Sequence, residues 1–187
     1  MVLLIKKHSR TSAALAARYL ELFRAVDAPI ATTGTVPLAE VVSEEVMRAR
    51  IAGAAKGGVY RALKAGQLYE QAMKNGFVAV SGAASKEVGD CGRNTILDEV
   101  RRDDQMLGYA RVTGGDPCAF CAMLASRGPV YKDGSDDPGD HEHGNCGYEP
   151  VYEGAEWPGR AREFRELWET EGGSLNTFRQ ALAKQAS

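Results

Sequence analysis

The chain has 187 residues, of which 44% are hydrophobic and 26% charged, and its 23 basic and 25 acidic side chains give a net charge of −2. This composition is that of a globular domain and excludes wholesale disorder, and the near-neutral charge argues against a strongly cationic nucleic-acid binder. No apolar run approaches the roughly 18 residues needed to cross a bilayer. Residues 1–5 are apolar but too few for a signal peptide, so no targeting segment is expected.

Four helices and no strand are predicted in residues 1–110. The first is capped near Ser12 and ends at Pro29. The second begins near Pro37, because proline is favoured in a first helical turn, and can extend to Leu63. The side chains expected to face the core are Leu15, Tyr19, Leu22, Phe23 and Val26 in the first helix and Leu38, Val41, Val42 and Val46 in the second.

Gly66 is expected to separate the second helix from a third. Thr95 and Asp98 form the pattern of a capping box, which predicts the start of a fourth helix. Residues 81–92 between the third and fourth helices give no clear pattern. The third helix is expected to contain Leu68, Met73 and Phe77. Four arginines flank the fourth helix and are predicted to be solvated: Arg93, Arg101, Arg102 and Arg111.

The pattern changes after the turn at Thr113. Asp116 followed by a proline predicts the cap and first turn of a short helix. That helix ends at Gly128, which stands before another proline. Two short strands are then expected at 130–131 and 149–152. This segment therefore predicts a small α+β unit.

Two more helices are predicted after Pro158, and Ser174 is a suitable N-cap for the second. Their expected core residues are Phe164, Leu167, Trp168, Leu175, Phe178 and Leu182.

The predicted fold is therefore mainly α. A helical body is expected over residues 1–110, and a Cys/His-rich lobe over 111–157. Within this lobe, residues near 112–152 form the α+β unit that a zinc ion is expected to stabilise. C-terminal helices over 158–187 are expected to pack on the body.

The sharpest signal is a cluster of cysteines and histidines. The sequence reads Cys118-x2-Cys121, then 21 residues, then His143-x2-Cys146, with His141 nearby. Two such pairs supply the four donors of a tetrahedral zinc site. His143 is preferred because it completes the second pair, but an extended segment would place His141 on the same face. Three thiolates and one imidazole leave no open position for water, so the predicted zinc is structural.

Three other interpretations remain open. Buried free cysteines behave as small hydrophobes and need no metal. The first cysteine pair at a helix N-terminus is also compatible with thiol-redox chemistry. A zinc-braced HNH-like nuclease would use His141 or His143 with acidic residues from 133–142. A zincin is excluded, because Asn145 stands where its motif requires the second histidine. Cys91 lies apart and is not assigned as a ligand.

The run RVTGGDPCAFCAMLASRGPVY at 111–131 resembles the minor head proteins of tailed phages that are related to protein F of bacteriophage Mu. HEHGNCGYEPVY at 141–152 resembles the His/Cys-rich stretch of the same family. The segments SGAA at 81–84 and LNTFR at 175–179 are also similar. The resemblance extends over about residues 10–185.

This resemblance implies a virion component inside the head or at the portal vertex, present in the host cytoplasm during assembly. Its expected partners are the portal protein or the major capsid protein, and its expected role is head assembly. The resemblance leaves open a part in DNA ejection and contact with packaged DNA. No membrane contact and no catalytic residue are expected.

Overall fold

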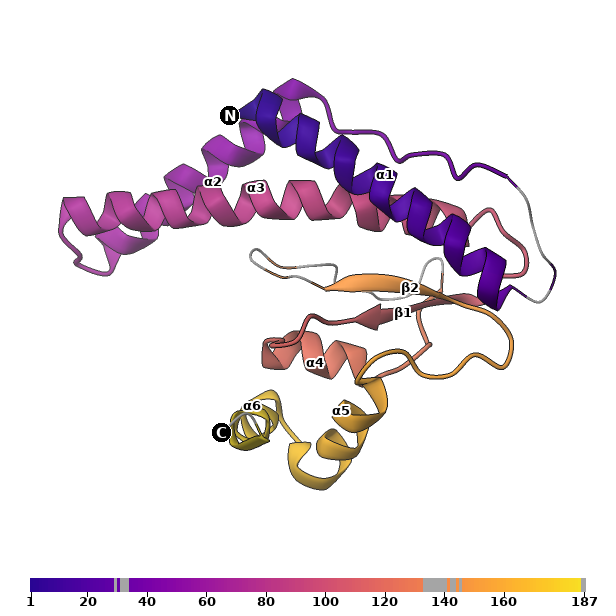
Figure 1. Ribbon diagram of the computed structural model, residues 1–187. Helices are drawn as coiled ribbons and strands as arrows, with labels where there is room; N and C mark the ends of the chain where they lie inside the picture. Colours follow the sequence, from indigo (N-terminus) through magenta and orange to yellow (C-terminus); the bar gives the residue numbers. More distant parts are fainter. Residues whose placement is uncertain (29, 31–33, 133–140, 142–143, 145, 186–187) are drawn as a thin grey trace.

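The computed structural model describes residues 1–28, 30, 34–132, 141, 144 and 146–185 (Figure 1). The elements are α1 (Val2–Asp27), α2 (Glu44–Lys64), α3 (Tyr69–Val100), β1 (Gly108–Val112), α4 (Ala119–Ala125), β2 (Gly147–Val151), α5 (Ala161–Leu167), the π-helical turn η1 (Trp168–Gly172) and α6 (Leu175–Gln185). The mainly helical fold class is thus confirmed. Within the described ranges, no helix combines the length and apolar character needed to cross a membrane.

α3 is the element on which the N-terminal helices are assembled. α2 packs along its first half and α1 along its second half, while the small sheet lies below α3 and α1 (Figure 1). A third helix with Leu68, Met73 and Phe77 and a separate fourth helix from Thr95 to Gly108 were predicted, but α3 is continuous through 81–92 and ends at Val100. Small residues make this possible, because they allow close packing that outweighs their low helix propensity. At Gly92, an added Cβ would lie 2.6 Å from the Ser12 hydroxyl oxygen of α1.

Several large apolar residues predicted to face the core instead lie on the surface. Leu15, Leu22 and Val26 of α1 are 67%, 55% and 82% exposed. The buried face of α1 includes the small residues Ser9, Ala13 and Ala17 between Ile5 and Leu20. The prediction followed side-chain size, whereas the helices approach each other through small residues. Leu38, Val46, Leu68, Met73 and Phe77 are likewise exposed.

The two-stranded sheet closes one side of the helical body. β1 and β2 are antiparallel, with Gly108 opposite Val151. Tyr109 and Tyr148 pack with ring centroids 4.8 Å apart, and Tyr109 also forms an isolated bridge with Tyr131. The strand predicted at 149–152 is confirmed with slightly shifted bounds, whereas that at 130–131 is reduced to the bridge. These tyrosines share a core cluster with residues of α1 and α3.

The C-terminal helices pack against α4. Phe164 of α5 and Phe178 of α6 are fully buried there with the alanines of α4. The predicted cap of α6 is confirmed, because the Thr177 backbone N–H donates to the Ser174 hydroxyl at 3.2 Å. Figure 1 shows this second core on the opposite side of the sheet from α1–α3. The division of the chain into three parts stays a prediction.

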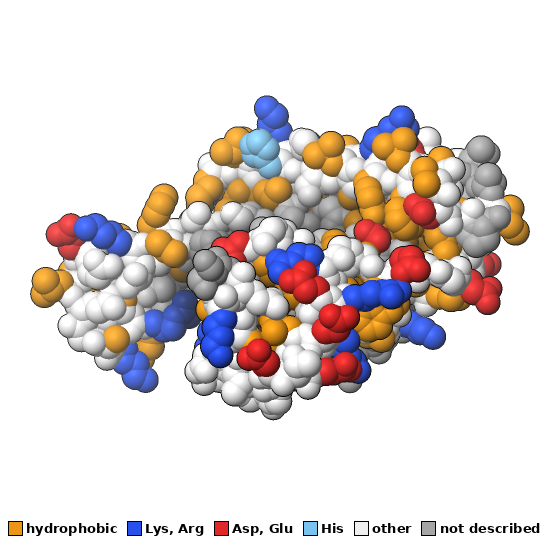
Figure 2. All heavy atoms as spheres, turned by 60° about the horizontal axis from the view of Figure 1, so that its bottom comes forward, with side chains coloured by type: hydrophobic (Ala, Val, Ile, Leu, Met, Phe, Trp, Pro, Cys, Tyr) orange, Lys and Arg blue, Asp and Glu red, His pale blue; other side chains and the backbone are white. Residues whose placement is uncertain are grey.

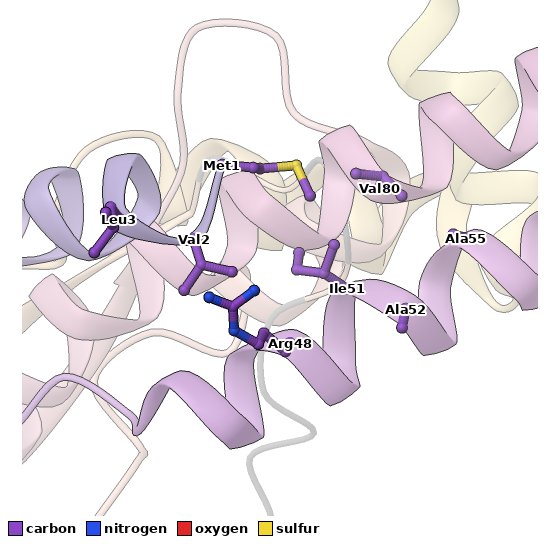
Figure 3. A pocket seen from close by; sticks show the side chains of 8 residues that line it. All are labelled: Met1, Val2, Leu3, Arg48, Ile51, Ala52, Ala55 and Val80. Carbon is purple, nitrogen blue, oxygen red and sulfur yellow. The ribbon is translucent and has the colours of Figure 1, made fainter.

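An apolar groove of about 550 Å³ lies where the first turn of α1 meets α2 and α3 (Figure 3). The Met1 side chain extends towards Val80, and Arg48 lies near Val2. The lining residues are Met1, Val2, Leu3, Arg48, Ile51, Ala52, Ala55 and Val80. Arg48 is the one lining residue with a charged side chain, and the other side chains are apolar.

The packing of α2 against α3, which we call the seam, predicts that substitution of two glycines of α2 changes stability in opposite directions. A Cβ added at Gly58 would lie 2.9 Å from the Asn75 carbonyl oxygen and 3.0 Å from the Ala79 Cβ, whereas one added at Gly53 meets nothing within 4 Å. We expect Gly58→Ala to lower the free energy of unfolding by about 1–3 kcal/mol through overpacking. Gly53→Ala should raise it by about 0.5–1 kcal/mol. Urea denaturation of both variants measures the difference, and equal effects would contradict this account of the seam.

Candidate metal centre

The start of α4 places the first two cysteines at one end of a helix. Cys118 is the N-cap residue, and its sulfur accepts a hydrogen bond from the Cys121 backbone N–H at 3.4 Å. The cap was predicted at Asp116, so the helix begins later than expected. Cys118 is exposed and Cys121 is buried. A capping cysteine and a first-turn cysteine therefore present their sulfurs on the same side of the helix start.

His141 brings its ring to both of these thiols. Its Nε2 lies 3.3 Å from the Cys118 sulfur, and its Nδ1 lies 3.7 Å from the Cys121 sulfur. Phe120 packs edge-on against the ring, with centroids 6.0 Å apart. The preferred ligand of the sequence prediction, His143, lies outside the described residues. Of the two candidate histidines, His141 is thus the one that the structure places with the cysteines.

Cys146 approaches from the other side, just before β2. It is buried, and its thiol forms a hydrogen bond with that of Cys121. Its carbonyl oxygen accepts a hydrogen bond from the Arg93 guanidinium of α3 at 3.0 Å. The same guanidinium pairs with Asp90 at 2.7 Å. α3 therefore helps to fix the third cysteine through a buried arginine.

Sequence reasoning missed this role of Arg93. Arg93 and Arg111 were predicted to be solvated, but both are buried, with exposures of 8% and 1%. Arg111 contacts the Tyr148 hydroxyl at 3.2 Å and lies over its ring. Arg93 also pairs with the neighbouring Asp90, but the contacts of Arg93 with Cys146 and of Arg111 with Tyr148 span 53 and 37 positions, so no local pattern could reveal them. The prediction of solvation was wrong for these two arginines, whereas Arg101 and Arg102 are exposed.

The electrostatics of the cluster keep its buried thiol protonated in the absence of a cation. The pKa of Cys121 lies far above its ordinary value, because its thiol is hydrogen-bonded to Cys146, is buried, and is also hydrogen-bonded to Cys118. A nearby divalent cation opposes this effect by favouring the thiolate. The site thus consists mainly of thiols. A bound metal ion would have to neutralise the negative charge of the thiolates that they become.

The donor set fits a tetrahedral zinc ion. Bonds of about 2.0–2.3 Å place neighbouring tetrahedral donors about 3.3–3.8 Å apart, and the distance of 3.3 Å between the Cys118 sulfur and Nε2 of His141 lies in this range. Donor atoms of Cys118, Cys121 and His141 all lie within 4.8 Å of one another. One imidazole nitrogen would serve as a ligand, and Cys146 would supply the fourth donor. Bound there, zinc would act as a cross-link between α4 and the segment before β2.

Cys91 is separate from this cluster. It lies on α3, and its thiol donates to the Ala39 carbonyl oxygen at 3.7 Å. Burial raises the pKa of this thiol, with a smaller effect from Asp90. Its position agrees with the prediction that it is not a ligand.

Comparison with known proteins gives the family. A family model described as VG15 protein matches residues 1–170, and so includes the whole cluster. The chain belongs to the VG15 protein family. The Gene 15 protein of Mycobacterium phage D29 is 32% identical, in a match covering 46% of this chain and 45% of that protein. The match thus spans less than half of that relative's length. No solved structure matches the chain significantly.

These findings confirm the bacteriophage part of the predicted resemblance. The VG15 match extends from α1 to η1 and thus covers both the helical body and the cluster. The narrower likeness to minor head proteins depends on the segments at 81–84, 111–131, 141–152 and 175–179, of which 111–131 contains the end of β1 and the whole of α4.

The cluster predicts that metal binding depends on Cys121. We expect Cys121→Ser to abolish stoichiometric zinc binding and to lower the free energy of unfolding by several kcal/mol, because metal affinity then contributes to folding. Cys91→Ser is the matched control, since it changes another buried cysteine. Zinc content by elemental analysis and thermal unfolding with and without a chelator measure both effects. Metal-free, well-folded wild-type protein would contradict the prediction.

The geometry also predicts which histidine matters. His141→Ala should lose zinc at a chelator concentration that His143→Ala withstands, because the His141 ring lies within 3.3 Å of the Cys118 sulfur and 3.7 Å of the Cys121 sulfur. Competition with a chromophoric chelator gives the two affinities. If His143→Ala instead lost zinc more readily than His141→Ala, His143 would be the ligand, as the spacing in the sequence predicts.

Proposed function

We propose that this VG15-family protein is a MuF-like minor capsid protein of a tailed phage, bound to the portal protein or to the major capsid protein. It acts in head assembly, in the capsid interior or at the portal vertex. A structural zinc ion held by Cys118, Cys121, His141 and Cys146 stiffens the Cys/His-rich lobe. The observation that carries this proposal is the grouping of Cys118, Cys121 and His141, whose donor atoms all lie within 4.8 Å of one another, with Cys146 hydrogen-bonded to Cys121.

The residues of the phage-like run support a binding role because they build the lobe. Arg111 is buried in β1, and Cys118 and Cys121 form the start of α4. The Tyr131 hydroxyl, at the end of the run, donates to the Leu124 carbonyl oxygen at 3.0 Å. The run thus specifies a folded unit with a metal-binding corner, which suits a protein that docks on other subunits.

The nuclease alternative is less well supported. Both ring nitrogens of His141 face thiol sulfurs, so this histidine belongs with the metal ligands and is not free to act as a base. No carboxylate joins the donor group found among the described residues. The acidic residues that the nuclease hypothesis requires at 133–140, and His143, lie outside that part of the chain.

A thiol-redox role is also less well supported. Reactive cysteines of such proteins have a lowered pKa that favours the thiolate. The raised pKa here belongs to the buried Cys121, and both Cys118 and Cys121 lie against the His141 ring, an arrangement that suits joint metal binding. We therefore propose a protein without turnover.

Co-assembly tests the proposed function. The protein is co-expressed with the portal and major capsid proteins of the same phage, and heads and free portals are isolated separately. We expect the wild-type protein in one or both fractions, and reduced retention of Cys121→Ser because the lobe loses its cross-link. Cys91→Ser is the control for both fractions. Absence of the wild-type protein from heads and portals alike would overturn the proposal.

A plasmid assay tests the enzyme alternative on the same preparation. We expect no nicking in the presence of Mg²⁺ or Mn²⁺. Nicking that disappears in His141→Ala or His143→Ala would replace the binding role by the nuclease.

A further inference from the structure

The α2–α3 hairpin projects from one end of the molecule as a two-helix arm (Figure 1). Its outer part carries seven large apolar side chains that are 45–81% exposed. We define the arm tip as Tyr60, Leu63, Leu68, Tyr69, Met73, Phe77 and Val78. This apolar surface arises because small residues of α2 and α3 pack against each other, so the large side chains of the same helices face outwards.

The arm tip is also basic. Lys56, Arg61 and Lys64 form no ion pair within the described part of the chain, while Lys74 is paired with Glu70 at 3.0 Å. Figure 2 shows orange and blue side chains together on the projecting arm. A partner surface for this tip must therefore be apolar and carry acidic groups.

The opposite end of the same molecule is apolar and carries acidic groups. The C-terminal ends of α1 and α3 lie there. Gln105, after α3, joins the segments that follow the two helices: its side chain accepts from the Ile30 backbone N–H at 3.0 Å and donates to the Ile30 carbonyl oxygen at 3.3 Å. We define the end patch as the exposed residues Leu22, Val26, Asp27, Ile30, Asp104 and Leu107. Asp27 and Asp104 have no basic partner among the described residues. Figure 2 shows orange and red side chains at this end.

We propose that the arm tip of one copy docks on the end patch of a second copy, head to tail. Unpaired lysine and arginine side chains then meet unpaired aspartates, and both surfaces lose apolar area to water. Three of the tip side chains are aromatic and 65–74% exposed, so at about 150–250 Å² each they alone expose roughly 300–500 Å². That lies within the about 300–600 Å² of the largest patch on a typical monomer, which is often functional, and the four aliphatic side chains add to it.

This contact joins different surfaces of identical chains. Such heterologous contacts close into a ring or continue as a filament, because each added copy presents a free tip and a free end patch. The contact is independent of the proposed zinc ion and of any virion role. It uses α1–α3 and the segments that follow α1 and α3.

Complementation of two defective variants tests the head-to-tail arrangement. Met73→Gln/Phe77→Gln removes apolar contacts from the tip, and Leu22→Gln/Val26→Gln removes them from the end patch. Both change exposed helix positions to a good helix former and leave the charges intact. Leu4→Gln/Leu15→Gln, also on exposed positions of α1, is the matched control.

Sedimentation equilibrium measures the masses. The wild-type protein and the control should exceed the 20.1 kDa of one chain as concentration rises, and added salt should reduce this association. Each defective variant alone should remain monomeric. Their equimolar mixture should form a dimer and stop there, because only one intact tip and one intact end patch can meet.

Three results would overturn the proposal. The first is a wild-type protein that remains monomeric at the highest soluble concentration. The second is self-association of the end-patch variant at wild-type strength, since that would indicate tip-to-tip pairing. The third is a mixture of the two variants that stays monomeric while the wild-type protein associates.

Discussion

The close approach of α3 to α1 and α2 is the constraint on which the N-terminal body depends. At the crossings there is no room for side chains: a Cβ on Gly76 would lie 2.6 Å from a methyl group of Val59, and one on Gly92 would lie 2.6 Å from the Ser12 hydroxyl oxygen. Small residues therefore occupy the seams. The larger apolar residues of the same helices are displaced to the outside, which explains why this body combines tight packing with an unusually apolar surface.

The same constraint explains which parts of the fold could be predicted. Helical periodicity identified most of the helices, and Ser174 was recognised as a cap because capping is a local interaction. The buried face of α1 could not be found from side-chain size, since Ala13 and Ala17 are buried while Leu15 is exposed. Which face of a helix is covered depends on its neighbours, and they are distant in the sequence.

The candidate metal centre, too, could be predicted only in part. Asp116 and the proline after it predicted a helix start at Cys118 and Cys121, and both cysteines lie there. The choice between the two histidines depended on the path of a loop, which spacing does not determine. Arg93 was missed for a further reason: it acts on the Cys146 carbonyl oxygen 53 residues away, through a buried hydrogen bond that no motif describes.

This hydrogen bond also relates the two cores of the protein. Arg93 belongs to α3 of the helical body, whereas Cys146 contacts Cys121 of α4, and α4 packs against α5 and α6. The cluster therefore lies at the junction between the body and the C-terminal core. The seams between α1, α2 and α3 contain none of its donors, so their packing does not require a cation. A metal at the cluster would instead restrict the position of α4, and through α4 the position of the C-terminal helices. In a protein that docks on larger assemblies, such a cross-link would keep two separate binding surfaces in a fixed relation without contributing to either of them.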